Sequence, residues 1–184
     1  GFGIARGYFW MTDDFRLGNI TDNLPYLDKW AIPPLTQSDH EELEQIFSQK
    51  FYYFGKGAQC YALESEDGKY VLKFFKFKHL RPNPIIQFFP PIEPFRQWKA
   101  QHYSHVQYKL HSLFDGHHMA FIEDRDYSGL VFIHLNQTHN LPIHTTIVDK
   151  IGLEHQLNLD PLIFVLQKKG ETLRNTLRRL LDRK

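Results

Sequence analysis

The sequence has one cysteine, no excess of charge of either sign and no long apolar run, and each feature excludes a class of protein. A single cysteine, Cys60, excludes a framework of internal disulfides. The 22 basic and 21 acidic residues leave a formal charge of +1, which is too balanced to indicate binding to nucleic acid. No apolar run approaches the roughly 20 residues of a membrane span. The 184 residues, 42% of them hydrophobic, are therefore expected to form a soluble domain with its own core.

Histidine is abundant, with 11 residues, but its spacing does not match that of a metal site. Zinc sites use three or four convergent ligands, and the sequence contains neither an HExxH pattern nor a Cys-and-His pattern. We therefore expect no metal ligand, and histidines that are solvated or hydrogen-bonded. Cys60, in a predicted strand, is expected to pack as a small half-buried side chain rather than to act as a nucleophile.

Local patterns predict an α+β fold in two segments. Residues 1–50 are expected to form an irregular arm and then a short helix over 39–50, which a capping box of Ser38 and Glu41 begins. The expected anchors of the arm are Trp10, Phe15, Tyr26 and Trp30. Residues 51–184 are expected to form one compact unit, an antiparallel sheet of about five strands with one long packed helix. Its predicted elements are strands near 51–63, 69–77, 118–122, 130–135, 143–151 and 161–167, and helices over 95–114 and 171–184.

Two connections between these elements have their own signals. Asp67 and Gly68, within "EDGK", form an Asp-Gly pair that is typical of the turn in an antiparallel hairpin. Pro94 suits the first turn of the long helix, which is expected to end near Gly116.

Residues 82–94 contain five prolines among large apolar side chains, which predicts a rigid apolar loop. Clustered exposed isoleucine and phenylalanine residues usually mark a contact surface, which would be a partner's groove or a membrane interface. The alternative, which we favour, is that the loop folds back over the sheet and is packed by its own apolar residues. A protein that binds this loop is the partner that the sequence indicates.

A pair of glycines and a lysine form the candidate site. Gly55 and Gly57 fall where one strand ends and the next begins, so the backbone there can approach a ligand and direct amides at phosphate oxygens. Because side chains alternate along a strand, Val71 and Lys73 share one face, and the lysine points among apolar residues. A buried ammonium needs an anionic partner, either a phosphate held under the glycines or a carboxylate from the long helix. Glycines also occur in many hairpins merely as turn or bulge residues.

This order of glycine turn, Asp-Gly hairpin, lysine, helix and further strands resembles the small N-terminal lobe of the protein-kinase-like fold. The glycine-loop pattern of that family, GxGxxGxV, is met by Gly55 and Gly57, while Cys60 stands at the third glycine and Ala62 at the valine. The strand motif V-A-I-K maps onto "YVLK", which ends at Lys73.

The resemblance implies a nucleotide site with ATP as its ligand. It implies that Lys73 contacts the α- and β-phosphates beneath Gly55 and Gly57, and that Ala62 and Val71 lie against the base.

The family also pairs this lysine with a glutamate from the helix, but residues 95–114 contain no Asp or Glu. Glu93, just before the helix, is the better candidate for that partner, because Gln107 within it would bring no charge. The segment "PLIFVLQKKG" resembles the fifth strand and the hinge, with residues 167–169 in the hinge. By the same comparison, residues 115–142 are expected to be an inserted hairpin.

Phosphoryl transfer also needs a catalytic base and side chains that hold Mg²⁺, which kinases carry in the large lobe. The sequence contains neither H-R-D-x-x-x-x-N nor D-F-G, so it offers no catalytic residue by this template. The resemblance therefore implies the nucleotide-binding lobe of an ATP-dependent phosphotransferase whose catalytic lobe, and the Mg²⁺ it holds, are absent from this chain. The alternative is a non-catalytic, pseudokinase-like module that presents the 82–94 loop to a protein partner.

The chain opens at Gly1 rather than at a methionine. The segment "GFGIARGYFW" is interpreted either as following a removed signal or anchor, or as an expression scar ahead of a packed or frayed terminus.

Overall fold

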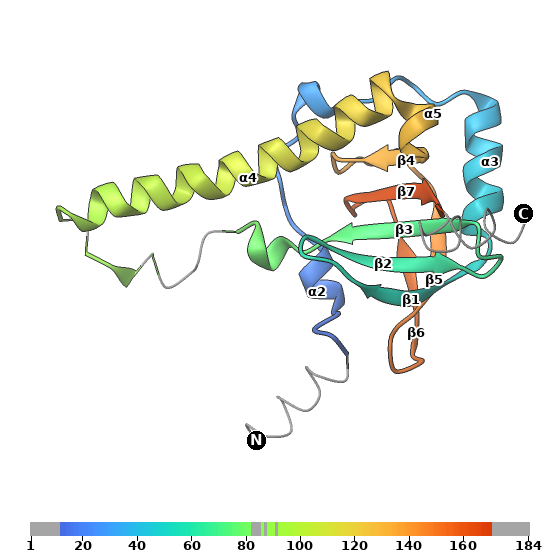
Figure 1. Cartoon of the computed structure of the whole chain (residues 1–184), viewed down its shortest axis with the longest axis horizontal. Helices are drawn as coiled ribbons and strands as arrows, with labels where there is room; N and C mark the ends of the chain where they lie inside the picture. The colour runs from blue at the N-terminus through green and yellow to red at the C-terminus, as the bar shows by residue number, and fades with distance from the viewer. Residues whose placement is uncertain (1–11, 82–85, 87, 91, 171–184) are drawn as a thin grey trace, which may run out of the picture.

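The computed structural model describes residues 12–81, 86, 88–90 and 92–170. They form a mixed sheet of seven strands with one long helix beside it (Figure 1), so the predicted α+β class is confirmed. The strands are β1 (Lys50–Lys56), β2 (Cys60–Ser65), β3 (Tyr70–Phe75), β4 (Leu130–His134), β5 (His144–Val148), β6 (Glu154–Asn158) and β7 (Phe164–Lys168). The helices are α2 (Leu17–Ile20), η1 (Asp28–Trp30), α3 (Gln37–Phe47), η2 (Phe77–His79), α4 (Phe95–Glu123) and α5 (Arg125–Ser128).

The sheet is larger than predicted and is not purely antiparallel. Its strands lie in the order β4-β7-β3-β2-β1-β5-β6, and β1 and β5 are the one parallel pair. The predicted five strands correspond only roughly to this sheet, because residues 118–122 are helical and β6 is an additional strand that pairs with β5 at the edge. The sequence pattern missed β6, in which Leu157 is the one buried residue, because so polar a strand shows little apolar alternation.

Apolar side chains pack on both faces of the sheet. One cluster joins the sheet to α3 and to the β5–β6 hairpin, and it includes Phe47, Phe51 and Phe164. A second cluster lies between the sheet and α4. Because side chains alternate along β3, Phe74 belongs to the first cluster and its neighbour Phe75 to the second.

Helix α3 begins two residues earlier than its predicted capping box would place it. The capping box is formed by Thr36 and Asp39 rather than by Ser38 and Glu41. The Thr36 hydroxyl accepts a hydrogen bond from the Asp39 amide at 3.2 Å, and the Asp39 carboxylate accepts one from the Thr36 amide at 2.9 Å. Both pairs have the required spacing, so the sequence alone did not distinguish between them.

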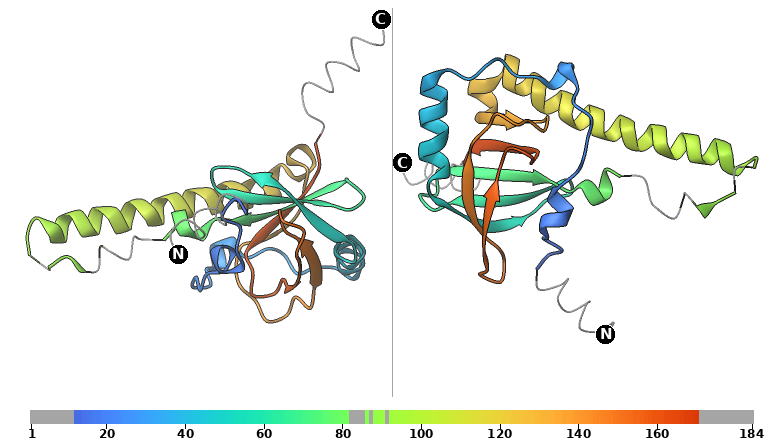
Figure 2. Two further views of the ribbon diagram at one scale, coloured as in Figure 1. Left: turned by 90° about the horizontal axis from the view of Figure 1, so that it is seen from below. Right: turned by 180° about the vertical axis from the view of Figure 1, so that it is seen from behind.

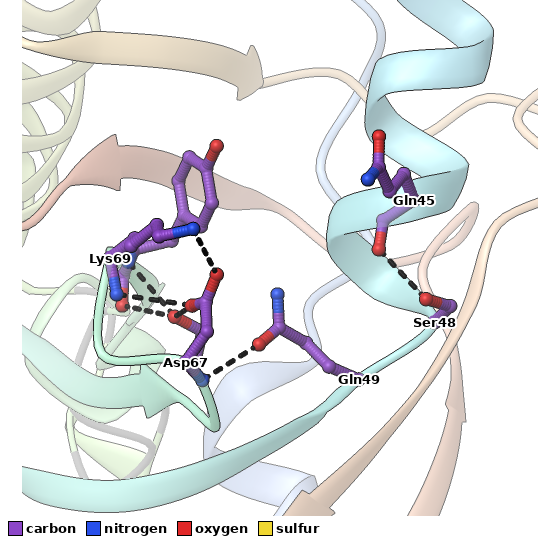
Figure 3. A network of polar contacts seen from close by, with 7 residues as sticks. Gln45, Ser48, Gln49, Asp67 and Lys69 are labelled. Carbon is purple, nitrogen blue, oxygen red and sulfur yellow. Dashed lines mark hydrogen bonds and ion pairs between the residues drawn. The ribbon is translucent and has the colours of Figure 1, made fainter.

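The predicted Asp-Gly turn joins β2 to β3, and Figure 3 shows the contacts that fix it. Gly68 has φ of +70°, a conformation that favours glycine. The Asp67 carboxylate accepts hydrogen bonds from the Ser65 hydroxyl at 2.7 Å and from the Lys69 amide at 3.1 Å. The Asp67 amide in turn donates to the Gln49 side chain at 3.0 Å, which ties the turn to the residue before β1.

Helix α4 is longer than predicted. It runs on through Gly116 to Glu123, so the predicted end near Gly116, the strand over 118–122 and the inserted hairpin over 115–142 are wrong. A glycine inside a helix costs only about 1 kcal/mol relative to alanine. The buried stripe also continues, since Phe121 lies seven residues after Phe114 and both are buried. The other end of α4 projects beyond the sheet (Figures 1 and 2).

The N-terminal arm packs on the domain through two of its four predicted anchors. Phe15 and Trp30 are buried, whereas Tyr26 is 55% exposed and anchors nothing. The Trp30 indole donates a hydrogen bond to Asp115 on α4 at 2.7 Å, and its ring lies edge-on to Phe114. Trp10 and the helix predicted over 171–184 lie outside the described residues.

Candidate functional site

Four of the six residues predicted to form the site come together on one face of the sheet. Gly55 on β1 is in register with Ala62 on β2, and Ala62 is in register with Lys73 on β3. Val71 shares that face of β3, two residues away. A Cβ atom built on Gly55 would meet nothing within 4 Å, so open space lies above this end of the row.

Lys73 is held by a neutral partner. Its ammonium donates a hydrogen bond to the side-chain oxygen of Gln167 at 2.5 Å, and the Gln167 amide donates to the Ser128 carbonyl at 2.7 Å. Within the described part of the chain, Lys73 makes no ion pair. The half-buried ammonium is thus oriented by an amide that leaves its full positive charge available to an anion.

Lys73 lines an open groove of about 420 Å³ between the sheet and α4. The helix side of the groove is formed by Ser112, Gly116, His117 and other small or neutral side chains. His117 Nδ1 lies 2.8 Å from the Leu113 carbonyl. Burial lowers the pKa of His117 below its ordinary value, and the charge of Lys73 lowers it further, against the opposing effect of that hydrogen bond. None of the α4 residues that line the groove carries a negative charge, so the helix brings no anionic partner to Lys73 there.

Gly57 lies at the end of the β1–β2 hairpin rather than in the row with Lys73. Its amide donates to the Cys60 carbonyl at 2.9 Å, and its carbonyl accepts a hydrogen bond from the Lys76 ammonium. Lys76 is 7% exposed and lies over the Tyr61 ring, and burial lowers its pKa. The polar groups of Gly57 are thus already hydrogen-bonded within the hairpin end and to Lys76.

The N-terminal arm forms ion pairs with lysines around this hairpin end. The Asp13 carboxylate lies 3.1 Å from the ammonium of Lys56 and 2.9 Å from that of Lys150, and Asp14 lies 3.0 Å from Lys78. The hydrogen bond from Lys150 is the main cause that lowers the pKa of Asp13. Both aspartates have positive φ, 53° and 61°, a conformation that costs about 1 kcal/mol or more and that these contacts stabilise.

Glu93 lies far from Lys73. It precedes the first residue of α4 and forms an ion pair with Arg96 at 3.1 Å. The groove is lined by α4 residues from Ser112 onward, about 26 Å along the helix axis from Phe95, its first residue. Gln107 is exposed on α4 and contributes nothing to the groove.

The hinge-like segment after β7 is tied to its neighbours by backbone contacts. The Lys168 amide donates to the Gly129 carbonyl at 2.8 Å, and the Lys169 amide donates to the Lys69 carbonyl at 2.7 Å. The Lys169 ammonium pairs with Glu64 at 2.6 Å and lies 5.5 Å from the centre of the Phe54 ring. Those two amides are therefore not available to a ligand in this conformation.

Cys60 matches its predicted structural role. Burial raises the pKa of its thiol to about 11, against the lowering effect of Lys73 and Lys76. The thiol is thus protonated at neutral pH and packs against the cluster beside α4.

The chain matches no protein-family model, no curated protein and no solved structure. Across the described residues, no three His, Cys, Asp or Glu side chains converge to hold a metal ion, and no helix has the length and apolar content to cross a membrane.

Gln167 is the site residue whose role the sequence analysis missed. It was assigned to the hinge, whereas it lies in β7 beside Val71. The available signal was the alternation of "FVLQK", which places Gln167 on the same face as Val165, next to Lys73.

Proposed function

We propose that this chain is a kinase-like nucleotide-binding lobe, in which the face formed by Gly55, Ala62, Val71 and Lys73 binds ATP. The observation that carries the proposal is the position of Lys73. It is a half-buried cation with a neutral partner, and it lies in one cross-strand row with Ala62 and Gly55. Lys73 would contact the phosphates, and the apolar surface of Ala62 and Val71 would lie against the base.

The arrangement of the elements supports the proposal. Strands β1, β2, β3, β7 and β4 are neighbours in that order, and each neighbouring pair is antiparallel. Helix α4 connects β3 to β4 and packs beside the strand that carries the lysine. A five-stranded antiparallel sheet with one long helix after the lysine strand is what the kinase-like resemblance implies.

Electrostatics at Lys73 favour a phosphate. A hydrogen bond between ionised groups contributes about 1.5–3 kcal/mol, roughly twice that of a neutral pair. Because Gln167 brings no negative charge, a phosphate would not compete with a carboxylate for the ammonium. Gly55, two strands from Lys73 in the same row, would leave open space for the ligand on this face.

The chemistry of phosphoryl transfer is proposed to depend on a lobe outside this chain. This lobe would supply the catalytic base and the carboxylates that hold Mg²⁺. The residues of this chain bind and orient the nucleotide, with Gln167 holding the Lys73 ammonium toward the groove.

A thermal-shift titration with ATP tests the proposal. ATP should raise the melting temperature of the wild-type chain, because a ligand that binds only the folded state stabilises it. Lys73→Met should abolish the shift, whereas Lys109→Met, at an exposed position on α4, should leave it unchanged. An equal shift in wild type and Lys73→Met would contradict the proposed site.

A second candidate function is a non-catalytic interaction module. The observation that favours it is the exposure of large apolar side chains near the projecting end of α4, among them Phe88 at 87% and Ile92 at 58%. This function predicts no thermal shift with ATP, and partner binding that survives Lys73→Met.

A further inference from the structure

The projecting end of α4 carries a cluster of apolar side chains, here called the distal tip and consisting of Phe88, Phe89, Ile92, Phe95 and Trp98. The Phe89 ring lies 5.4 Å from that of Phe95 and 5.5 Å from that of Trp98, measured between centroids. These contacts form a small aromatic platform around the first turn of the helix.

Part of the distal tip faces solvent, although the loop was predicted to fold back over the sheet. Ile86 is buried, as that prediction requires, but Phe88 is 87%, Ile92 is 58% and Trp98 is 45% exposed. Single exposed apolar residues are ordinary, whereas a contiguous group at the end of a projecting element usually marks a contact surface. The tip lies away from the sheet in each view of the ribbon (Figures 1 and 2).

Basic residues outnumber acidic ones on this part of the helix by more than they do in the chain as a whole. Residues 93–114 contain Arg96, Lys99 and Lys109 but only one acidic residue, Glu93, whereas the whole chain has 22 basic and 21 acidic residues. Glu93 pairs with Arg96. The next acidic residue along the helix is Asp115, which pairs with Lys29 of the N-terminal arm.

We propose that the distal tip inserts into the interface of an anionic lipid bilayer. Tryptophan and phenylalanine favour the boundary between headgroups and acyl chains, and basic side chains beside them attract anionic headgroups. A bilayer can accept a projecting apolar tip whose nearest charged residues are Arg96, Lys99 and the single acidic residue Glu93, whereas an acidic protein partner would have to offer a pocket for Phe88 and Ile92.

Helix α4 would then hold the candidate nucleotide site away from the lipid. Ser112 lies 14 residues after Trp98, about 21 Å along the helix axis. The groove would therefore stay accessible while the tip is inserted. The lipid proposal rests on the distal tip alone and does not depend on the proposed nucleotide site.

Vesicle cosedimentation of the full chain tests the proposal. Wild type should bind vesicles that contain phosphatidylserine, and should bind pure phosphatidylcholine vesicles and high-salt samples much less. Replacing both Phe88 and Ile92 by serine should lower partitioning onto the anionic vesicles by about tenfold or more. The control Tyr127→Ser, a residue that is 94% exposed on α5, should bind as wild type does.

A second readout covers the case in which the double variant fails to fold. Brominated lipids should quench the fluorescence of the wild type, and Trp98→Phe should lose that quenching although Trp10 and Trp30 remain. No binding of wild type to anionic vesicles, equal binding by the folded double variant, or quenching that persists in Trp98→Phe would each overturn the proposal. Capture of an acidic protein through the tip, without vesicle binding, would assign the surface to a protein partner instead.

Discussion

The two parts of α4 differ in what their side chains contact, although they belong to one continuous helix. The proximal part, residues 106–123, buries Leu110, Phe114 and Phe121 against the sheet and the arm. The distal part, residues 95–105, buries no residue fully and exposes Trp98. The difference indicates that folding stability comes mainly from the proximal part, whereas the distal part contributes little to it.

The largest effect is expected from Phe114→Ala. Phe114 is fully buried and its ring lies 5.0 Å from Phe75 and 4.8 Å from Trp30, so its loss should leave a cavity that lowers the free energy of unfolding by about 3–5 kcal/mol. Urea unfolding measures the change. Trp98→Ala is the matched distal control, with an expected loss of about 0.5 kcal/mol. Similar losses in both variants would remove the distinction between the two parts.

Asp115→Ala should destabilise the chain by about 1–3 kcal/mol, because it leaves the buried Trp30 indole without its acceptor. The lost ion pair to Lys29 is half-exposed and should add little. Asp115→Asn keeps an acceptor oxygen and should recover most of the stability in the same unfolding assay. If the asparagine variant were as unstable as the alanine variant, the negative charge of Asp115, rather than its hydrogen bond with the indole, would account for the stabilisation.

Stability should fall as the pH drops below about 6.5, the ordinary pKa of histidine. Burial lowers the pKa values of His117 and His134 in the folded state, so each unfolded histidine binds a proton before its folded counterpart does. The stabilisation is fully present above the unfolded pKa and is lost as pH falls toward the folded values, by at most about 1.4 kcal/mol per pH unit for each histidine.

Urea unfolding between pH 5 and pH 7.5 measures this slope. His117→Gln and His134→Gln should each make it shallower. An unchanged slope in both variants would show that other groups titrate in this range.

The smallest effect is expected from Gly116→Ala. A Cβ atom at Gly116 would meet nothing within 4 Å, so the variant should gain about 0.5–1 kcal/mol from helix propensity alone. Ser104→Ala in the distal part should gain a similar but smaller amount, because propensity acts locally in both parts. Thermal unfolding would detect the gain, and a loss of stability at Gly116 would show that the helix packs more closely there than the structure indicates.

Local sequence signals predicted the elements that depend on local chemistry. The Asp67-Gly68 turn needs a residue that tolerates positive φ, and the alternation along β3 is enough to place Val71 and Lys73 on one face. The burial of Phe15 and Trp30 follows from their size and apolar character.

The features that the sequence did not predict depend on contacts between distant segments. The parallel pairing of β1 with β5 joins residues that are about 95 positions apart, and no local pattern encodes it. The partner of Lys73 is Gln167, 94 residues away, rather than the nearer Glu93, because α4 carries Glu93 away from the sheet. Gly116 was interpreted as a helix end because glycine favours that position, but tertiary packing of Phe121 overrides this preference.

The most direct test of the account is an NMR titration of the lysine side-chain ammonium groups with ATP. Lys73 lies in the open groove, whereas the Lys76 ammonium donates a hydrogen bond to the Gly57 carbonyl at the hairpin end. If ATP binds at Lys73, the Lys73 Nζ signal should shift on addition of ATP and the Lys76 signal should not. A shift at Lys76 with none at Lys73, or no shift at either lysine, would contradict it.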